Sequence, residues 1–256
     1  MKIRWAACAL ATAAAFTATA SEWASVPGGP FKSALRYEDV PAGTQVAAFQ
    51  LMQAPVTNGE YLEFVRAHPE WRRGRAPIAL AEARYLSHWE HDLAPGPKAA
   101  REQPVTWVSW FAANAYCESQ RARLPTWQEW EYVAAADESR RDARADPAWR
   151  ERILGWYARP SNEALPAVGQ GPPNAFGVKD VHGLVWEWVD DASALLVSGD
   201  DREQGSADRR QFCGAGALAM DDRDNYAILM RVAMLSSLGA ADATGNLGFR
   251  CARRLP

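Results

Sequence analysis

The sequence predicts an irregular, loop-rich α+β fold. Two observations point to this class. The candidate helices and strands are short, and glycine, proline and tryptophan are frequent, with 18, 16 and 12 copies among 256 residues. A chain with many short elements of both kinds and abundant turn residues favours a mixed fold over a helical bundle or a repeat array. The length suits one large domain or two small ones.

The first elements are two strands and a helix. Residues 26–31 combine a strand with a glycine-rich bend, and residues 46–51 form a short apolar strand. Thr57 and Glu60 have the spacing of a capping box, in which each side chain bonds the other residue's backbone N–H. We therefore expect a helix over 58–67 that ends before the following proline.

A long loop, a strand and a second helix come next. Residues 69–103 are rich in proline, glycine and arginine and largely without periodicity, which indicates a surface excursion. Residues 104–110 alternate apolar and polar side chains as a strand does. Ser109 is placed to cap a helix that follows this strand.

A second capping box, Thr126 with Glu129, starts a third helix with tryptophans on one face. Residues 137–152 are densely charged, and we interpret them as a solvated helix or loop. Residues 160–173 are rich in turn residues. Residues 200–210 are polar and are interpreted as a mobile surface segment.

The first twenty residues have the layout of a secretory signal peptide. Lys2 and Arg4 precede an apolar run at 5–15, and small residues at 18–20 form a cleavage site. The run is too short for a confident membrane span. We expect cleavage after Ala20, a periplasmic or secreted protein, and no stable membrane insertion afterwards. A retained N-terminal anchor is the alternative.

Charge and cysteine content limit the partners and the chemistry. The formal net charge is −3, and loss of the basic N-terminus makes it more negative still. A mildly acidic chain without a basic block argues against nucleic acid as a partner. In an oxidising compartment, Cys117, Cys213 and Cys251 allow one disulfide and one leftover thiol.

Six blocks of the sequence resemble the formylglycine-generating enzyme family, also called sulfatase-modifying factors. The most specific is Asn-Leu-Gly-Phe-Arg-Cys at 246–251, which is similar to the family's C-terminal signature. The other blocks precede it in the family's order, at 26–31, 55–65, 104–117, 123–132 and 174–188. The resemblance implies a single domain over 21–256, with the family's fold, which is related to C-type lectins and low in regular secondary structure.

The resemblance also implies a structural calcium site. Asp180 and Glu187 would supply carboxylates, and Gly183 and Val185 would supply backbone carbonyls. Hard oxygen ligands suit Ca²⁺. The alternative interpretation is that Glu187 makes a salt bridge and Asp180 caps a turn.

A family disulfide would join Cys117 to Cys251. Because the loop that it closes is long, it would contribute about 4–5 kcal/mol to stability. A second family disulfide falls at Ala134 and Val232, where both thiols are absent.

The main departure from the family lies in the tail. Counting back from the C-terminal signature, the two copper-binding cysteines of the family's oxidases fall at Asp222 and Ala227. Cu(I) prefers soft thiolate ligands, which neither residue offers. Copper is therefore not expected, and oxidation of sulfatase cysteines by the copper mechanism is disfavoured. Cys213 lies outside the ligand positions and is interpreted as a buried, unreactive cysteine.

Exported family members without the copper thiols include accessory proteins of copper nitrite reductases and proteins that mature pigments. Residues 85–89 and 105–113 resemble the nitrite-reductase accessory branch most. We therefore interpret the chain as a maturation or accessory factor for a protein or peptide partner in the periplasm. Polar groups in a shallow groove would orient a peptide backbone or an anionic group. The candidates for this groove are Asp222, Asn225, Tyr226, Arg231 and Ser236.

Two other functions stay open, so the sequence does not decide whether the protein is an enzyme. An oxidase with altered metal ligands would use the aspartates of 221–224 with a histidine, or the pair His88 and His91. A lectin-like binding module would instead hold a peptide or sugar in an aromatic cleft. The candidates for that cleft are Trp89, Trp107 and Trp110.

Overall fold

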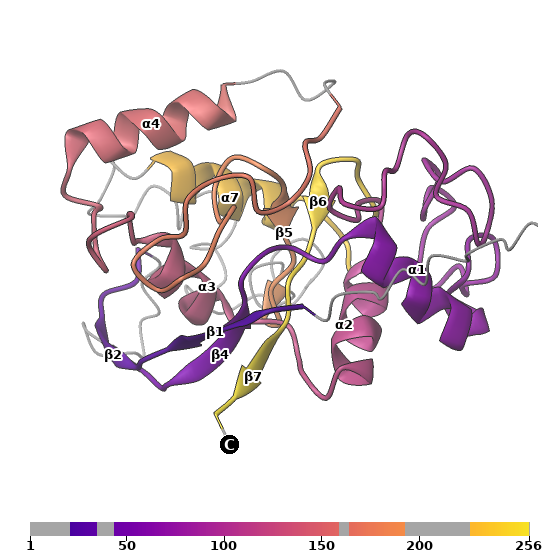
Figure 1. Cartoon of the computed structure of the whole chain (residues 1–256), viewed down its shortest axis with the longest axis horizontal. Helices are drawn as coiled ribbons and strands as arrows, with labels where there is room; N and C mark the ends of the chain where they lie inside the picture. The colour runs from indigo at the N-terminus through magenta and orange to yellow at the C-terminus, as the bar shows by residue number, and fades with distance from the viewer. Residues whose placement is uncertain (1–20, 35–43, 159–163, 193–225, 256) are drawn as a thin grey trace, which may run out of the picture.

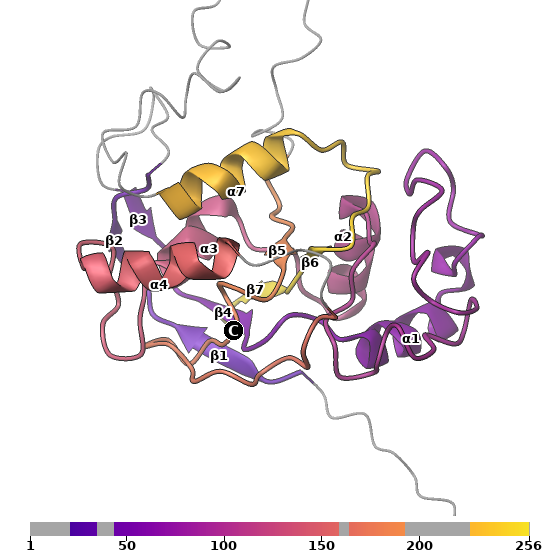
Figure 2. The same cartoon turned by 90° about the horizontal axis from the view of Figure 1, so that it is seen from above.

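The computed structural model describes residues 21–34, 44–158, 164–192 and 226–255, and Figure 1 shows its arrangement. Short helices and three small sheets surround one main hydrophobic core, so the predicted α+β class is confirmed. Helices α1 and α2 lie at one end of the molecule, and α3, α4 and α7 lie at the other (Figures 1 and 2).

The strands bring the two ends of the described chain together. β1 (Trp23–Val26) pairs antiparallel with β4 (Phe49–Met52), and β4 pairs on its other edge with β7 (Ala252–Arg254). β2 (Gly29–Phe31) pairs with β3 (Thr44–Val46). The predicted apolar strand at 46–51 is thus present as two strands, because the chain leaves one sheet and enters another between β3 and β4.

A third, two-stranded sheet links the middle of the chain to the tail. β5 (Trp186–Glu187) pairs parallel with β6 (Leu247–Gly248). Neither strand exceeds two residues, but the pairing places the segment around Glu187 beside the C-terminal signature. This contact determines which buried charges meet in the core.

Three helices begin at the predicted caps. Thr57 and Glu60 form a capping box at the start of α1 (Asn58–Ala67), with the predicted bounds. Thr126 and Glu129 form another at α3 (Trp127–Ala134). Ser109 accepts a hydrogen bond from Ala112 at the start of α2 (Trp110–Ser119).

The strand predicted at 104–110 is absent. Trp107 has a left-handed backbone (φ +54°), which ends the extended conformation that the alternating pattern indicated. Its carbonyl accepts a hydrogen bond from the N–H of Leu86, which is also left-handed (φ +49°). Hydrogen bonds to other loops hold this segment in place, instead of the hydrogen bonds between paired strands.

The loop at 69–103 contributes to the core, contrary to the prediction of a surface excursion. After the short 3₁₀ helix η1 (Pro69–Trp71), the chain buries Tyr85, Leu86 and Trp89. The hydroxyl of Tyr85 lies 2.7 Å from that of Tyr61 in α1 and donates to the carbonyl of Trp71 at 2.8 Å.

The charged stretch leads into a helix with a buried face. Asp146 caps α4 (Pro147–Tyr157), whose Trp149 and Ile153 are buried. α4 lies beside α7 (Tyr226–Ser236), as Figure 2 shows from above. No helix of the described segments is long and apolar enough to cross a membrane. Residues 1–20 and 200–210 lie outside the described residues.

Candidate functional site

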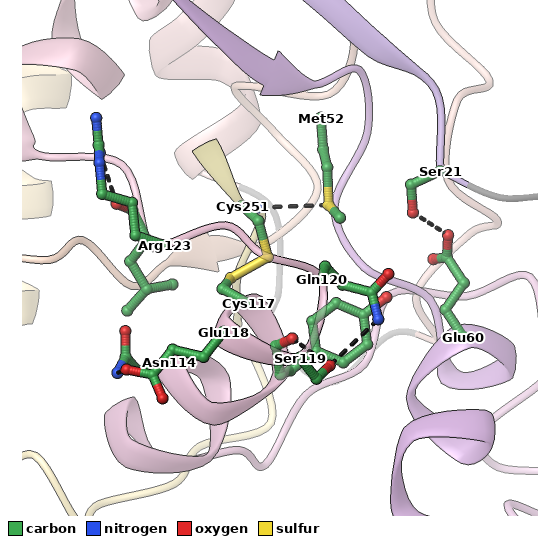
Figure 3. Close-up of a disulfide and its surroundings, with 12 residues drawn as sticks. Ser21, Met52, Glu60, Asn114, Cys117, Glu118, Ser119, Gln120, Arg123 and Cys251 are labelled. Carbon is green, nitrogen blue, oxygen red and sulfur yellow. Dashed lines mark hydrogen bonds between the residues drawn. A yellow bond between two sulfur atoms is a disulfide. The ribbon is translucent and has the colours of Figure 1, made fainter. Parts of the chain in front are cut away.

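The disulfide implied by the resemblance is present. Cys117 in α2 is bonded to Cys251, just before β7, with their Cα atoms 5.5 Å apart (Figure 3). Both residues are fully buried, and the N–H of Cys251 donates to Sδ of Met52 at 3.4 Å. The disulfide therefore holds the C-terminal signature against α2, and the hydrogen bond to Met52 holds it against the end of β4.

The arginine of the same signature, Arg250, forms a buried ion pair. Nη2 of Arg250 is 2.7 Å from Oε1 of Glu187, and both side chains are 0% exposed. Nε1 of Trp130 in α3 donates to Oε2 of this carboxylate at 2.9 Å. A buried ion pair is tolerated when further hydrogen bonds satisfy its atoms, and Trp130 supplies one of them.

The two carboxylates predicted to bind calcium have other partners in this structure. Both oxygens of Glu187 face Arg250, so a calcium ion bound to Glu187 would meet a guanidinium. The carboxylate of Asp180 accepts a hydrogen bond from the N–H of Gly169 instead. The salt bridge that the sequence offered as the alternative for Glu187 is the arrangement found. Among the described residues, no three His, Cys, Asp or Glu side chains gather as a metal site.

Two backbone positions of this predicted calcium loop are also defined. Gly183 has a left-handed backbone (φ +85°) and lies against the ring of Trp156 in α4. A Cβ at this position would be 2.7 Å from Cδ2 of Trp156, so only glycine fits. Val185 is buried immediately before β5. The glycine is thus required by a close helix contact and a turn.

Arg231 is buried and does not line a shallow groove. It is 1% exposed, and its Cζ lies 3.5 Å from the centre of the Trp130 ring. Its Nη2 donates to the backbone carbonyl of Glu187, whereas its Nε has no hydrogen-bond partner among the residues that the structure describes. Burial lowers the pKa of Arg231 to about 10, against the opposing influence of the Glu187 charge. No pattern in the sequence predicts that the Trp130 ring lies under this guanidinium.

Among the other groove candidates, Ser236 is the one whose side chain the structure describes, and it does not join Arg231. Ser236 ends α7, and its hydroxyl donates to the carbonyl of Ala233 at 3.1 Å. Five residues along a helix place it on a different face from Arg231. Tyr226 is the first residue of α7. The two remaining candidates, Asp222 and Asn225, lie outside the described residues, as does Cys213.

His182 is a half-buried group that the sequence does not single out as functional. Its Nε2 donates to the carbonyl of Ala134 at 2.8 Å, and its Nδ1 lies 3.3 Å from the hydroxyl of Tyr157. These two contacts assign the proton of the neutral ring to Nε2. Trp156 stacks on the imidazole. Burial lowers the pKa of His182 to about 4. The position follows from the packing of α4, which no local pattern reveals.

The three tryptophans of the predicted aromatic cleft have different surroundings. Trp89 is a core residue, 1% exposed, whose Nε1 donates to Asn58 at 2.9 Å. Trp110 is half-buried and donates from Nε1 to the carbonyl of Val189 at 2.8 Å. Trp107 is half-buried and lies under the guanidinium of Arg84, at 5.5 Å. Of these three, only Trp107 has an indole N–H without a hydrogen-bond partner among the described residues.

The two histidines of the alternative metal pair are unlike each other. His91 is exposed, whereas both ring nitrogens of His88 are buried and have no hydrogen-bond partner in the described part of the chain. Burial lowers the pKa of His88 to about 4, and the charge of Arg73 adds to this shift. A neighbouring guanidinium disfavours a metal cation at His88.

Comparison with known proteins supports the resemblance. Residues 9–255 match the family described as the sulfatase-modifying factor enzyme 1-like domain. The match begins inside the segment interpreted as a signal peptide, so the domain boundary at residue 21 stays a prediction.

Three relatives illustrate the range of the family. Formylglycine-generating enzyme of Streptomyces coelicolor is 33% identical over 192 residues, which cover 65% of this chain and 58% of that protein. Inactive C-alpha-formylglycine-generating enzyme 2 of Mus musculus is 28% identical over 274 residues, covering 89% and 84%. Hercynine oxygenase of Mycobacterium tuberculosis is 31% identical over 170 residues, covering 56% and 38%.

The chain therefore spans less than two thirds of the Streptomyces enzyme and of hercynine oxygenase, but most of the inactive mouse protein. With the disulfide and the C-terminal signature in place, the match over nearly the whole sequence is decisive. This chain belongs to the sulfatase-modifying factor enzyme 1-like family.

Proposed function

We propose that this protein is an exported accessory or maturation factor that acts on a protein or peptide partner without a copper-thiolate centre. The observation that carries the proposal is the chemistry of the tail. Asp222 and Ala227 occupy the two positions that the family resemblance assigns to copper ligands. Cu(I) is held by soft thiolates, and neither side chain replaces one.

The packing of α7 supports a structural role for the segment that follows. Ala227 lies in the first turn of this helix, and Arg231 one turn later is fixed in the core over Trp130. The helix is thereby attached to α3 by a buried residue. The likeness to the inactive mouse protein, over 89% of this chain, is consistent with a scaffold kept without the oxidase chemistry.

Trp107 is the residue that we assign to partner contact. Its left-handed backbone is uncommon for a bulky side chain, and such conformations cluster at functional sites. The half-buried indole has an unused N–H and a guanidinium above it, from Arg84. Aromatic and arginine side chains of this kind are the ones that anchor protein interfaces.

The proposal is tested with the purified mature protein and a candidate client from the periplasm. A copper nitrite reductase precursor is the first to try, because two segments of the chain resemble that accessory branch. Crosslinking followed by mass spectrometry should recover a complex with the wild type and much less with Trp107→Ala. Trp23→Ala is the matched control, because Trp23 is also half-buried under an arginine, Arg253, but lies in β1.

Equal loss of the complex in both variants would contradict the assignment of Trp107. Conversion of a cysteine to formylglycine by the purified protein would contradict the accessory function as a whole. Cell fractionation tests the export step, since the mature protein should begin near Ser21 and appear in the periplasm or medium.

A further inference from the structure

Each nitrogen of the Arg250 guanidinium lies within hydrogen-bond distance of at least one oxygen atom. Its Nε lies 3.0 Å from both carboxylate oxygens of Glu187, and its Nη2 lies 2.7 Å from Oε1 of the same residue. Nη2 also donates to the carbonyl of Lys179 at 3.0 Å. Nη1 donates to the carbonyls of Met52 and Gln53, both at 3.2 Å. All three nitrogens of the guanidinium are therefore bonded, and the side chain is 0% exposed.

These acceptors come from parts of the chain that are far apart in sequence. Met52 and Gln53 stand at the end of β4, Lys179 precedes Asp180, and Glu187 lies in β5. One carboxylate and three backbone carbonyls are the kind of donors that a hard cation takes. Here the cation that gathers them is the guanidinium of the C-terminal signature.

The positive charges of Arg231 and Arg250 disfavour a further cation at Glu187. Arg250 pairs with the carboxylate of Glu187, and Arg231 donates to the backbone carbonyl of the same residue. The charge of Arg250 also lowers the pKa of Arg231, which shows that the two arginines repel each other. A divalent ion bound at Glu187 would meet both of them in a water-poor interior.

We propose that Arg250 is the structural cation of residues 179–187, where it binds Glu187, one of the four residues that family resemblance predicts to bind calcium. Its guanidinium joins this segment to β4 and to the C-terminal tail. The protein accordingly reaches and keeps its fold without bound calcium. The proposal concerns the scaffold and does not depend on the partner or on Trp107.

The first test uses the wild-type protein. Its thermal unfolding midpoint is measured after exhaustive treatment with a calcium chelator and again in excess calcium chloride, with magnesium chloride as the ionic control. We expect the same midpoint in all three conditions. A lower midpoint in chelator that calcium alone restores would overturn the proposal.

The second test is chemical rescue of Arg250→Ala. This change leaves a cage of oxygens shaped for a planar cation, so millimolar guanidinium chloride should raise the lowered midpoint, and equal sodium chloride should not. Arg253→Ala is the matched control, because Arg253 lies three residues away and outside the cage, over Trp23. Guanidinium should not raise the midpoint of that variant.

Rescue of Arg250→Ala by calcium in preference to guanidinium would overturn the proposal. If that variant fails to fold, Arg250→Lys replaces it, since an ammonium keeps the charge but cannot match the planar fork. A lowered midpoint that does not respond to calcium is then expected. A midpoint equal to the wild type would show that the fork is not needed and would refute the proposal.

Discussion

Removal of the Cys117–Cys251 disulfide is expected to lower the free energy of unfolding by about 5 kcal/mol. The two cysteines are 134 residues apart in sequence. A crosslink of this span restricts the unfolded chain strongly, and the loop-entropy relation gives about 5 kcal/mol at 25 °C. Both cysteines are fully buried, so replacing them by alanine also removes two buried sulfur atoms, and the lost packing adds to this cost.

The assay is equilibrium unfolding in urea of the double variant Cys117→Ala, Cys251→Ala. Each kcal/mol shifts the thermal midpoint of a domain of this size by about 2–4 °C, so a fall of about 10–20 °C should accompany the change. Wild-type protein unfolded in the presence of a reductant should match the double variant. Cys213 stays in both proteins and serves as an internal control for effects of a free thiol.

A double variant within about 1 kcal/mol of the wild type would refute this reasoning, because the loop relation allows no such small value without strain. A changed slope of the urea transition would locate the effect in the compactness of the unfolded chain. In that case the loss of stability would not measure the crosslink alone.

Three further predictions concern the buried charges and the helix contacts. Glu187→Gln should cost about 3–5 kcal/mol in urea unfolding, because Arg250 is left as an uncompensated buried charge. Gly183→Ala should destabilise by about 1–3 kcal/mol in the same assay, because it combines a left-handed backbone with a clash against Trp156. For His182, the folded pKa of about 4 lies below the ordinary value of 6.5, so stability is full above pH 6.5 and falls as the pH drops toward 4. The loss from this residue should reach about 3 kcal/mol, and His182→Gln should remove that part of the pH dependence. An unchanged pH dependence in His182→Gln, or Glu187→Gln and Gly183→Ala variants as stable as the wild type, would contradict the corresponding contacts.

The features that the sequence predicted best are local. α1 and α3 begin at capping boxes because each depends on two residues three apart, such as Thr57 and Glu60. A hydrogen bond between residues three apart in sequence depends little on the rest of the fold. The same holds for Ser109 at the start of α2.

Patterns failed where a distant contact overrode them. The alternation at 104–110 resembles a strand, but the chain turns at Trp107, whose N–H and carbonyl bond Thr244 and Leu86 in other loops. Residues 69–103 lack periodicity, yet Trp89 is among the most buried side chains. Aperiodic segments carry core residues that a period-based interpretation cannot detect.

The candidate site could be predicted only where the family resemblance supplied the pairing. The pairing of Cys117 with Cys251 comes from this resemblance. For Glu187 the sequence offers a salt bridge as one of two alternatives, but it does not indicate the partner Arg250, which lies 63 residues away. The sequence predicts that Arg231 lines a groove, whereas the residue is buried. Its burial over Trp130 depends on how α7 packs on α3, which is a tertiary property.

The central claim is that this family member has kept the scaffold and lost the copper chemistry. The most direct test is to incubate the purified mature protein with Cu(I), oxygen and a Cys-x-Pro-x-Arg peptide. Copper bound per chain and the peptide mass are then measured together. We predict no stoichiometric copper and no conversion of the peptide cysteine to formylglycine. Stoichiometric copper together with formylglycine, both lost in Asp222→Ala or in Cys213→Ala, would contradict the account.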